Sequence, residues 1–450
     1  MTQCGDTRND FSMSQAMPAP GPQTPFDLDA NDESLPLLRD WFERHGDIHR
    51  VATLSRAHDA LVLHDPDAIR AVLLTRRDNY VKGVGLERVR MLLGNGLIVS
   101  DGEVWARQRR LVQPAFHSAV IRGFAPMVES RNAALVERWA AKAARGETID
   151  VTHELSTVSL DIVLRALFGS DLDRLVASEG HNPFDLLADE SRRDLVFAAR
   201  FRALTRCVRA IIDSRRQAAD DAGDRSERDF LSMLMAARDK HNGAAPMSDR
   251  ALLDEVMTLI VAGHETTAST LNWTWYLLAS HPEVQEQVHT TLGDAAAASP
   301  ATDDAGLGSG FIDQVLQEAL RLYPPVWLFT RRALQDDTIG GFHVGAGTDV
   351  FICPYLLHRH PAHWHRPEAF EPDRFAAAAV AARHRFAYLP FSAGPRFCIG
   401  SGFAMAEMAT HVRQVTRRFR LAYVGPVPAA AEFQINLRSR DHLQMRLTPR

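Results

Sequence analysis

Apolar residues recur at spacings of three and four over most of the chain, which is the pattern of helices with one buried face. The clearest runs lie at 37–46, 66–75, 103–116, 126–144, 153–168 and 195–216. A longer apolar run begins at Ser248 and continues to Ser280, where His281 and Pro282 end it. At 1.5 Å per residue, this run predicts a helix of roughly 50 Å, long enough to cross a whole domain.

Short segments rich in β-branched and other apolar residues predict a few strands. They lie at 48–53, 60–64, 337–345 and 348–353, and within the last part of the chain. No glycine-rich dinucleotide fingerprint follows any of them. The pattern therefore predicts a mainly α fold with a minor β portion.

Some segments carry little structural signal. Residues 1–25 are polar and rich in proline, so we expect a mobile leader there. The charged stretch 213–229 has no apolar spacing and is interpreted as a solvated connection. Segments 293–310 and 376–382 are rich in Ala, Gly, Ser and Asp, which is typical of loops or weak helices.

Charge and hydropathy exclude several classes of protein. The formal net charge is −5, and no Lys/Arg-rich block occurs, which argues against nucleic acid as the main partner. The long apolar run is interrupted too often for a membrane span, by Asp254, Glu255, His264 and Glu265. The N-terminus resembles neither a secretory signal nor a membrane anchor, so we expect a soluble protein.

The four cysteines are scattered along the chain at Cys4, Cys207, Cys353 and Cys398. They form no C-x-x-C pair, so neither a disulfide framework nor a four-thiolate metal site is indicated, and a reducing cytoplasm fits best. A lone cysteine is usually a small buried hydrophobic residue, and this interpretation stands for the first three.

Cys398 lies in the segment F-S-A-G-P-R-F-C-I-G at 391–400, directly before a helical pattern that begins near Gly402. Unpaired N–H groups and the dipole at a helix N-terminus favour a thiolate. Gly394 permits a tight turn, and Gly400 lets the backbone approach a flat ligand. Arg396 is suited to bind a carboxylate. The loop therefore suits a ligated cofactor with acidic side groups.

This segment resembles the haem loop F-x-x-G-x-R-x-C-x-G of the cytochrome P-450 superfamily. All fixed positions are met, by Phe391, Gly394, Arg396, Cys398 and Gly400. The resemblance implies a cytochrome P-450 fold in which 26–450 form one large domain. It also implies that Cys398 is the axial thiolate ligand of haem b (iron protoporphyrin IX) and that Arg396 contacts a haem propionate. Thiolate ligation favours O–O cleavage.

Two further motifs resemble structural elements of that superfamily. E-A-L-R at 318–321 places Glu318 and Arg321 on one helix face, where surface ion pairs are the common explanation. Y-P-P follows at 323–325 and F-E-P-D-R-F at 370–375, in the order of the family's K-helix and meander. The resemblance implies a triad of Glu318, Arg321 and Arg374 that holds the core around the cysteine loop.

Other cations would contact the haem propionates by the same resemblance. W-A-R-Q-R-R at 105–110 begins a helix, and Trp105 and Arg109 face the same way. Such pairs are usually packing features, but the family places two propionate contacts here and another at Arg331. Together with Arg396, three arginines would neutralise two buried carboxylates.

A-G-H-E-T-T at 262–267 lies on the long helix and resembles the family's oxygen-activating motif. Ala262 and Gly263 are small enough to admit a flat macrocycle and O₂. A threonine hydroxyl can bend the local hydrogen bonding. Glu265 and Thr266 form an acid–alcohol pair suited to proton delivery. The alternative is a solvent-facing Glu beside an intrahelical Thr, but a polar pair inside an apolar helix is costly.

Two metal-site alternatives are weaker. H-E-T-T-A resembles the start of a zincin helix, but Ala268 replaces the second histidine. The cluster H-R-H-P-A-H-W-H at 358–365 contains a proline and has no helical spacing, so we assign it to structure.

The resemblance implies a haem-thiolate monooxygenase that inserts one oxygen atom from O₂ into a hydrophobic small molecule. Electrons from NAD(P)H would arrive through a separate ferredoxin and ferredoxin reductase, met by Arg107, Arg110, Arg413, Arg417 and Arg418. Residues 326–328 would line the pocket and 186–212 would form part of its lid. The segment 323–332 is similar to soluble bacterial members that oxidise cyclic terpenes, so a terpenoid is the expected substrate.

Three alternatives stay open: a fatty-acid hydroxylase, a peroxide-driven haem-thiolate enzyme, and a non-catalytic helical ligand-binding protein. Glu265 and Thr266 argue against the peroxide-driven enzyme, and the intact Cys398 loop argues against the binding protein. We expect a cytoplasmic monomer without a membrane anchor.

Overall fold

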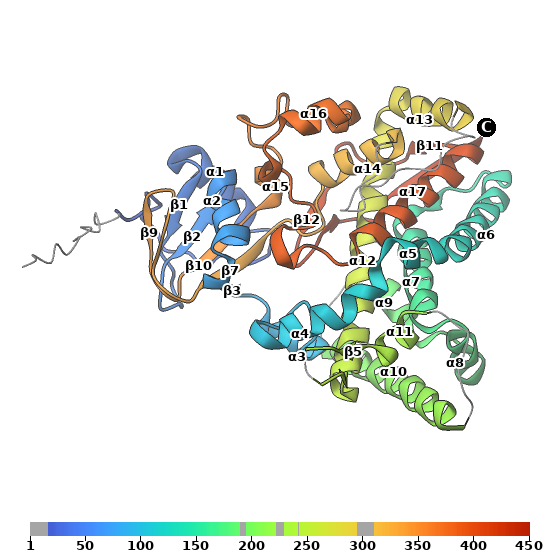
Figure 1. The fold of residues 1–450 in the computed structure, drawn as a ribbon. Coiled ribbons are helices and arrows are strands. Elements are labelled where there is room, and N and C mark those ends of the chain that lie inside the picture. Colours follow the sequence, from blue (N-terminus) through green and yellow to red (C-terminus); the bar gives the residue numbers. More distant parts are fainter. Residues whose placement is uncertain (1–16, 190–194, 222–228, 242, 295–309) are drawn as a thin grey trace, which may run out of the picture.

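The computed structural model describes residues 17–189, 195–221, 229–241, 243–294 and 310–450. Most of the described chain is helical, as the apolar spacing predicts (Figure 1). The helices are α1 Ser34–His45, α2 Pro66–Arg70, α3 Glu87–Leu93, α4 Gly102–Val112, α5 Ser118–Gly123, α6 Ala125–Ala144, α7 Val151–Phe168, α8 Asp171–Glu179, α9 Leu186–Asp189, α10 Leu195–Asp221, α11 Phe230–Ala236, α12 Asp249–Ser280, α13 Pro282–Asp294, α14 Phe311–Leu322, α15 Pro354–Leu357, α16 Ala377–Ala382 and α17 Ser401–Arg418.

A five-stranded sheet forms the minor β portion, with the order β1-β2-β10-β7-β3. Its strands are β1 Ile48–Val51, β2 Ala60–Leu63, β10 Asp349–Ile352, β7 Phe329–Ala333 and β3 Tyr80–Lys82. β2 and β10 are parallel neighbours, and the other pairs are antiparallel. The sheet lies at one end of the molecule beside α1 and α2, and most helices lie at the other end (Figure 1).

The remaining strands form smaller sheets. One has the order β11-β14-β4, and the others are the pairs β5–β6, β8–β9 and β12–β13. Their bounds are β4 Ile149–Asp150, β5 Arg238–Asp239, β6 Ala245–Pro246, β8 Asp337–Ile339, β9 Phe342–Val344, β11 Phe419–Tyr423, β12 Ala431–Phe433, β13 Leu437–Ser439 and β14 Gln444–Pro449.

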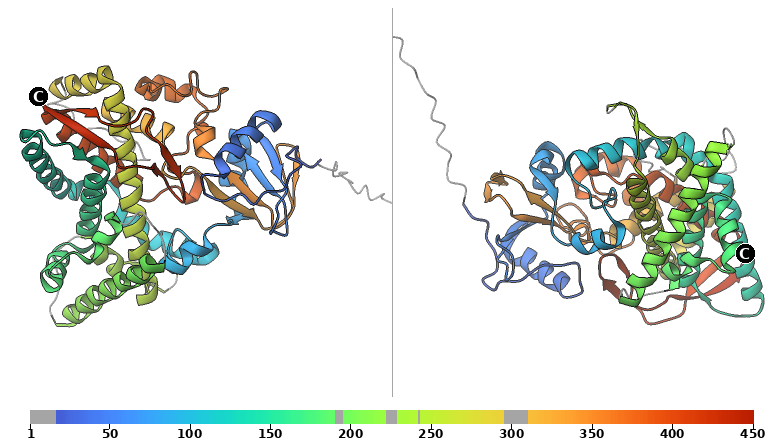
Figure 2. Two further views of the ribbon diagram at one scale, coloured as in Figure 1. Left: turned by 180° about the vertical axis from the view of Figure 1, so that it is seen from behind. Right: turned by 90° about the horizontal axis from the view of Figure 1, so that it is seen from below.

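α12 is the long central helix, and it runs through the helical part of the molecule (Figure 2). Ser248 is its N-cap, with a side chain that accepts a hydrogen bond from the Ala251 N–H. It ends at Ser280, because Pro282 cannot continue the backbone ladder. α12 packs against α7, α10, α14 and α17. The prediction of a buried helix over this stretch is therefore confirmed.

The stretch expected to be a solvated connection is partly helical. α10 continues to Asp221, and its Arg215 is buried. The Arg215 guanidinium forms ion pairs with Asp171 at 2.5 Å and Asp229 at 2.7 Å. These buried ion pairs, and not an apolar face, hold this part of α10 against the protein. Residues 222–228 lie outside the described part of the chain, as do 295–309 of the segment expected to be a loop.

The ordered body begins before residue 26, earlier than expected. Residues 1–16 of the expected leader, with Cys4, lie outside the described residues. The next residues follow the sheet edge, because Met17 O accepts a hydrogen bond from His343 N and Pro20 O accepts one from Arg50 N. Ala19 is buried in the small core under the sheet. The segment 376–382 contains the short helix α16.

Candidate functional site

The loop 391–400 is closed by a hydrogen bond that Cys398 N donates to Phe391 O at 2.9 Å. Gly394 has φ +70°, and a Cβ there would lie 2.1 Å from Leu73 O. The glycine is therefore required both by its conformation and by the approach of another backbone. Phe391 and Phe397 pack edge to face at 6.2 Å, which fixes the two sides of the loop.

The Cys398 thiol is exposed although it is surrounded by protein. Burial raises its pKa, and N–H groups of Gly400 and Ser401, at the start of α17, together with the charge of Arg109 lower it in part. The N–H donors expected from a helix N-terminus are thus present, but burial raises the pKa of the thiol more than they lower it. Cys398 is therefore accessible at a place where protein packs around its thiol.

A window of accessible surface also lies in the middle of α12. Residues 252–258 and 267–278 are buried, whereas Ala262, Glu265 and Thr266 between them are partly exposed. Other parts of the protein therefore leave this turn of α12 partly uncovered. The Thr266 hydroxyl donates a hydrogen bond to Ala262 O at 2.8 Å, so it occupies the carbonyl one turn earlier.

Two residues of the same motif face the protein. A Cβ at Gly263 would lie 3.1 Å from Val163 on α7, so this glycine serves the contact between α12 and α7. The expectation that it leaves room for a macrocycle is wrong for Gly263 and stays a prediction for Ala262. His264 is buried, with Nε2 3.0 Å from the Ser156 hydroxyl, also on α7.

Arg396 is held by the beginning of α4. Its Nη1 donates to Ser100 O at 3.2 Å, and its Nη2 pairs with the Asp101 carboxylate. The guanidinium carbon lies 4.5 Å from the centre of the Trp105 ring. Arg109, one turn along the same helix, donates to Phe397 O at 2.9 Å. The structure therefore brings Trp105, Arg109 and Arg396 together at the thiol loop.

Arg331 and Lys82 extend this cluster of cations. Arg331 lies on β7, directly opposite Lys82 on β3. Burial, helped by the charge of Arg396, lowers the pKa of Arg331 to about 10, and Asp101 opposes the shift. Burial also lowers the pKa of Lys82 well below its usual value, with like charges on Arg331 and Arg396 adding to the effect.

Sequence reasoning missed Lys82 as a member of this cluster. The lysine stands in a three-residue strand, and no motif in the sequence marks it. Its neighbour Arg331 is distant in the chain, and the pairing of β3 with β7 is what joins them. Arg109, Arg331 and Arg396 alone outnumber Asp101, the carboxylate that pairs with Arg396. An excess of cations suits a ligand that carries carboxylates.

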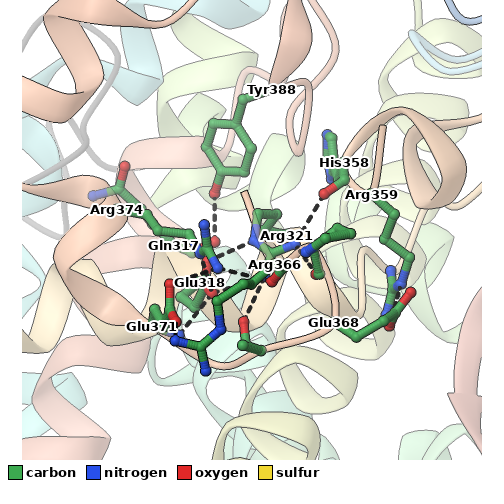
Figure 3. A network of polar contacts seen from close by, with 12 residues as sticks. Gln317, Glu318, Arg321, His358, Arg359, Arg366, Glu368, Glu371, Arg374 and Tyr388 are labelled. Atoms are coloured by element: carbon green, nitrogen blue, oxygen red, sulfur yellow. Dashed lines mark hydrogen bonds and ion pairs between the residues drawn. The ribbon is translucent and has the colours of Figure 1, made fainter. Parts of the chain in front are cut away.

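The Glu318, Arg321 and Arg374 triad forms as the sequence predicts (Figure 3). Arg321 and Glu318 have no exposed side-chain surface, and Arg321 Nε lies 2.6 Å from Glu318 Oε2. Arg374 Nε lies 3.3 Å from Glu318 Oε1. Arg321 also donates to three carbonyls, of His358, Pro367 and Ala369. The triad thereby ties α14 to the segment that leads into the thiol loop.

The histidine-rich segment 358–365 packs into the same region. His358 Nε2 accepts a hydrogen bond from Leu389 N at 2.8 Å, which supports the turn before the thiol loop. His360 Nε2 lies 3.0 Å from Asp47. Within the described ranges, no group of three His, Cys, Asp or Glu side chains is placed to hold a metal ion.

The expected pocket wall is only partly accessible. Val326 is exposed, but Trp327 has no accessible surface, and Leu328 is buried. Trp327 Nε1 donates to Gln434 O at 2.6 Å, and its ring packs on Phe433. Trp327 therefore belongs to the core, because a hairpin from the C-terminal part covers it. Of the expected lid at 186–212, residues 190–194 lie outside the described part of the chain.

The "Cytochrome P450" family model matches residues 24–433. The chain belongs to this family. It is therefore an oxidoreductase that incorporates oxygen from O₂, and its fold is the cytochrome P450 fold. The predictions of family, fold class and enzyme class are confirmed.

Two relatives of this P450 come from Streptomyces melanosporofaciens. Cyclooctatin synthase is 35% identical over 380 residues, which are 81% of this chain and 80% of the relative. Cyclooctat-9-en-7-ol 5-monooxygenase is 32% identical over 403 residues, which are 85% of this chain and 84% of the relative.

Solved P450 structures share the fold. The crystal structure of a cytochrome P450 named CYP102L1 has a TM-score of 0.82 at 25% identity, covering 97% of this chain and 100% of its own. The cytochrome P450DA heme domain has a TM-score of 0.80 at 24% identity, covering 97% of this chain and 98% of its own. No described helix of this P450 has the length and hydropathy that a membrane crossing requires.

The family implies a haem-thiolate cofactor, and the residues of this site fit one. Cys398 is accessible although protein surrounds its thiol. At Gly400 an added Cβ would find its nearest neighbour beyond the adjacent residues, in Phe116, 4.0 Å away, so it would not collide with the protein. The arginines near the thiol loop outnumber the carboxylate that pairs with them, as a ligand with carboxylate groups requires.

Proposed function

We propose that this P450 binds haem b through Cys398 and oxidises a cyclic terpenoid. The observation that carries the proposal is that Cys398 is accessible and that its thiol is met by the N–H groups of Gly400 and Ser401. We infer a hollow for haem between this thiol and the accessible turn of α12. N–H contacts of this kind stabilise a sulfur that carries negative charge. When bound, the thiolate-ligated iron would supply O₂ activation, the chemistry that no side chain of the site provides.

The cations would hold the cofactor's carboxylates. Arg331 and Arg396 are buried or partly buried and lack a full complement of negative charge, so propionates would satisfy them. Trp105 and Arg109 stand beside them on α4, and Lys82 faces Arg331 across the sheet edge. Ala262 and Gly400 would leave room for the macrocycle, and Phe391 and Gly394 shape the loop.

Glu265 and Thr266 are the proposed proton-delivery pair. The Thr266 hydroxyl is bonded to Ala262 O at the accessible window of α12, and a small rotation would release it toward the hollow. Glu265 is partly exposed beside it and can exchange a proton with water. Thr266→Val should retain haem but waste electrons as hydrogen peroxide. Thr270→Val, which removes the same type of bond to Thr266 O one turn on, is the matched control.

Electrons would come from separate proteins, a ferredoxin and an NAD(P)H-dependent reductase. Of the arginines expected to meet an acidic carrier, Arg107 and Arg110 pair with Asp239 at 3.3 and 3.5 Å, and Arg418 pairs with Glu137. These three arginines already pair with carboxylates of this protein, which argues against their binding an acidic carrier. A carrier could bind them only by replacing Asp239 and Glu137 as their partners. We propose that this P450 acts in the cytoplasm.

A terpenoid is favoured over a fatty acid as substrate. The relatives at 35% and 32% identity are named for cyclooctatin and a cyclooctatenol, both of which are cyclic compounds. The segment before β7 supplies Val326 as an accessible apolar wall. A bulky cyclic hydrocarbon fits an apolar hollow without needing a polar anchor.

A Soret-band titration of the purified protein tests both parts. We expect a Soret band with thiolate character, and a saturable low-to-high-spin shift with cyclic terpenoids and not with straight-chain fatty acids. Cys398→Ser should abolish that band, whereas Cys353→Ser, a substitution in the buried core, should not. A shift with fatty acids alone would reject the substrate, and absence of the band in the unaltered protein would reject haem-thiolate binding.

A further inference from the structure

Asp101 occupies the N-cap position of α4 but does not cap it. Its backbone is extended, as at other N-caps, yet its side chain accepts no hydrogen bond from the first turn of the helix. A capping aspartate typically contributes about 1 kcal/mol to helix stability. The chain forgoes that contribution here, so the carboxylate has another task.

The carboxylate instead joins three parts of the cofactor region. Both oxygens accept from the backbone N–H of Lys82 at 3.2 Å, which fixes the end of β3. Oδ1 also pairs with Nη2 of Arg396, in the thiol loop. The same guanidinium lies over Trp105, one turn into α4. Asp101 therefore connects a sheet edge, the thiol loop and α4 at one point.

The charge of this carboxylate acts on three cations of the cluster. Asp101 raises the pKa values of Lys82, Arg331 and Arg396, and in each case it opposes the larger effect of burial. It thereby favours the charged form of all three side chains. Without it, the cluster would hold one more uncompensated positive charge.

We propose that Asp101 is a positioning residue of the haem site, which holds Arg396 against Trp105 and lowers the net positive charge of the cluster beside the cofactor. The inference rests on the proposed function, because it assumes that haem occupies the hollow. It assigns Asp101 no contact with haem. Its effect passes through the orientation of Arg396 and through the charge beside the cofactor.

The test compares Asp101→Asn with a matched substitution. Asp349 offers a similar arrangement nearby: it accepts from the Val84 N–H at 3.2 Å, just after β3, and pairs with Arg332 of β7 at 2.8 Å. Asp349→Asn is therefore the control for loss of a strand-to-arginine carboxylate bridge. Haem release is measured by transfer to excess apomyoglobin, and the iron reduction potential by spectroelectrochemistry.

Asp101→Asn should release haem at least about tenfold faster, since a charge-assisted contact that orients Arg396 is lost. The reduction potential should rise, because removal of a negative charge beside the iron favours the reduced form. Asp349→Asn should change neither quantity. If Asp101→Asn matches the unaltered protein in both, or if Asp349→Asn changes both equally, the proposal is overturned.

Asp101→Glu changes the position of the carboxylate but keeps its charge. This variant tests the positioning role of Asp101 if Asp101→Asn does not fold. The longer side chain keeps the charge but displaces the carboxylate, so release should be faster while the potential stays close to that of the unaltered protein. Release at the unaltered rate would overturn the positioning role. The proposed function fails separately, if the unaltered protein shows no Soret band at all.

Discussion

The substitution Gly394→Ala tests how tightly the thiol loop is fixed against the N-terminal part of the chain. At φ +70°, a residue with a Cβ is strained by about 1–2 kcal/mol. The added Cβ would also lie 2.1 Å from Leu73 O, where 3.4 Å is ordinary contact. Leu73 is part of η1, a π-helical turn at Ala71–Thr75, so its carbonyl cannot move aside without disturbing that turn.

Overpacking of this kind adds about 1–3 kcal/mol, so the free energy of unfolding should fall by about 2–5 kcal/mol in total. Urea unfolding followed by circular dichroism measures the loss, and the Soret absorbance per protein reports haem retention. Gly123→Ala, at the end of α5, is the control: it has no left-handed φ, and an added Cβ would meet nothing within 4 Å. It should not lower the unfolding free energy, because alanine favours a helix over glycine. A loss below about 1 kcal/mol for Gly394→Ala would refute the reasoning.

Three further outcomes are expected. Glu318→Gln should cost about 3–5 kcal/mol, because it leaves the fully buried Arg321 charge without its anion, whereas Glu137→Gln, which breaks an exposed pair with Arg418, should cost less than about 1 kcal/mol in the same urea unfolding. His49 and His64 are buried, and burial lowers the pKa of His49 to about 4 and that of His64 well below its usual value, so both stay neutral when folded but bind protons near pH 6.5 when unfolded. The contribution of these two histidines to stability should therefore be fully present above about pH 6.5 and be lost as the pH drops toward 4, and a melting-temperature series over that range should show a shallower fall for His64→Leu; an unchanged slope would contradict this assignment. Lys82→Met should lower the haem content of the purified protein without loss of helical circular dichroism, and full haem content would remove Lys82 from the cofactor site.

The long central helix was predictable because its signals are local. Ser248 caps the start, Pro282 enforces the end, and the apolar run between them needs no knowledge of partners. The thiol loop was likewise marked by residues that are close in sequence. The triad was not marked by local residues alone. Glu318 and Arg321 are close in sequence, but only the family resemblance indicated that Arg374 would contact them.

The features that were missed depend on contacts between distant segments. Lys82 joins the cation cluster because β3 pairs with β7, and no local pattern encodes that register. Trp327 is buried because Gln434 and Phe433 cover it, more than 100 residues later in the chain. Gly263 matches the motif, but a side chain at this position would point toward α7. That direction depends on how α12 is rotated about its axis, which the motif does not specify.

The parallel pairing of β2 with β10 has a consequence for the order in which this protein is made. The two strands stand almost 290 residues apart in the chain, so β2 leaves the ribosome long before its partner exists. The thiol loop is later still, and it closes on Leu73 and Asp101 from the early part. A nascent chain therefore cannot assemble the haem site until synthesis has almost finished. β1 and β2 can pair with each other at once, but the other edge of β2 and the whole of β3 must wait for β10 and β7, which exposes them to chaperones in the meantime.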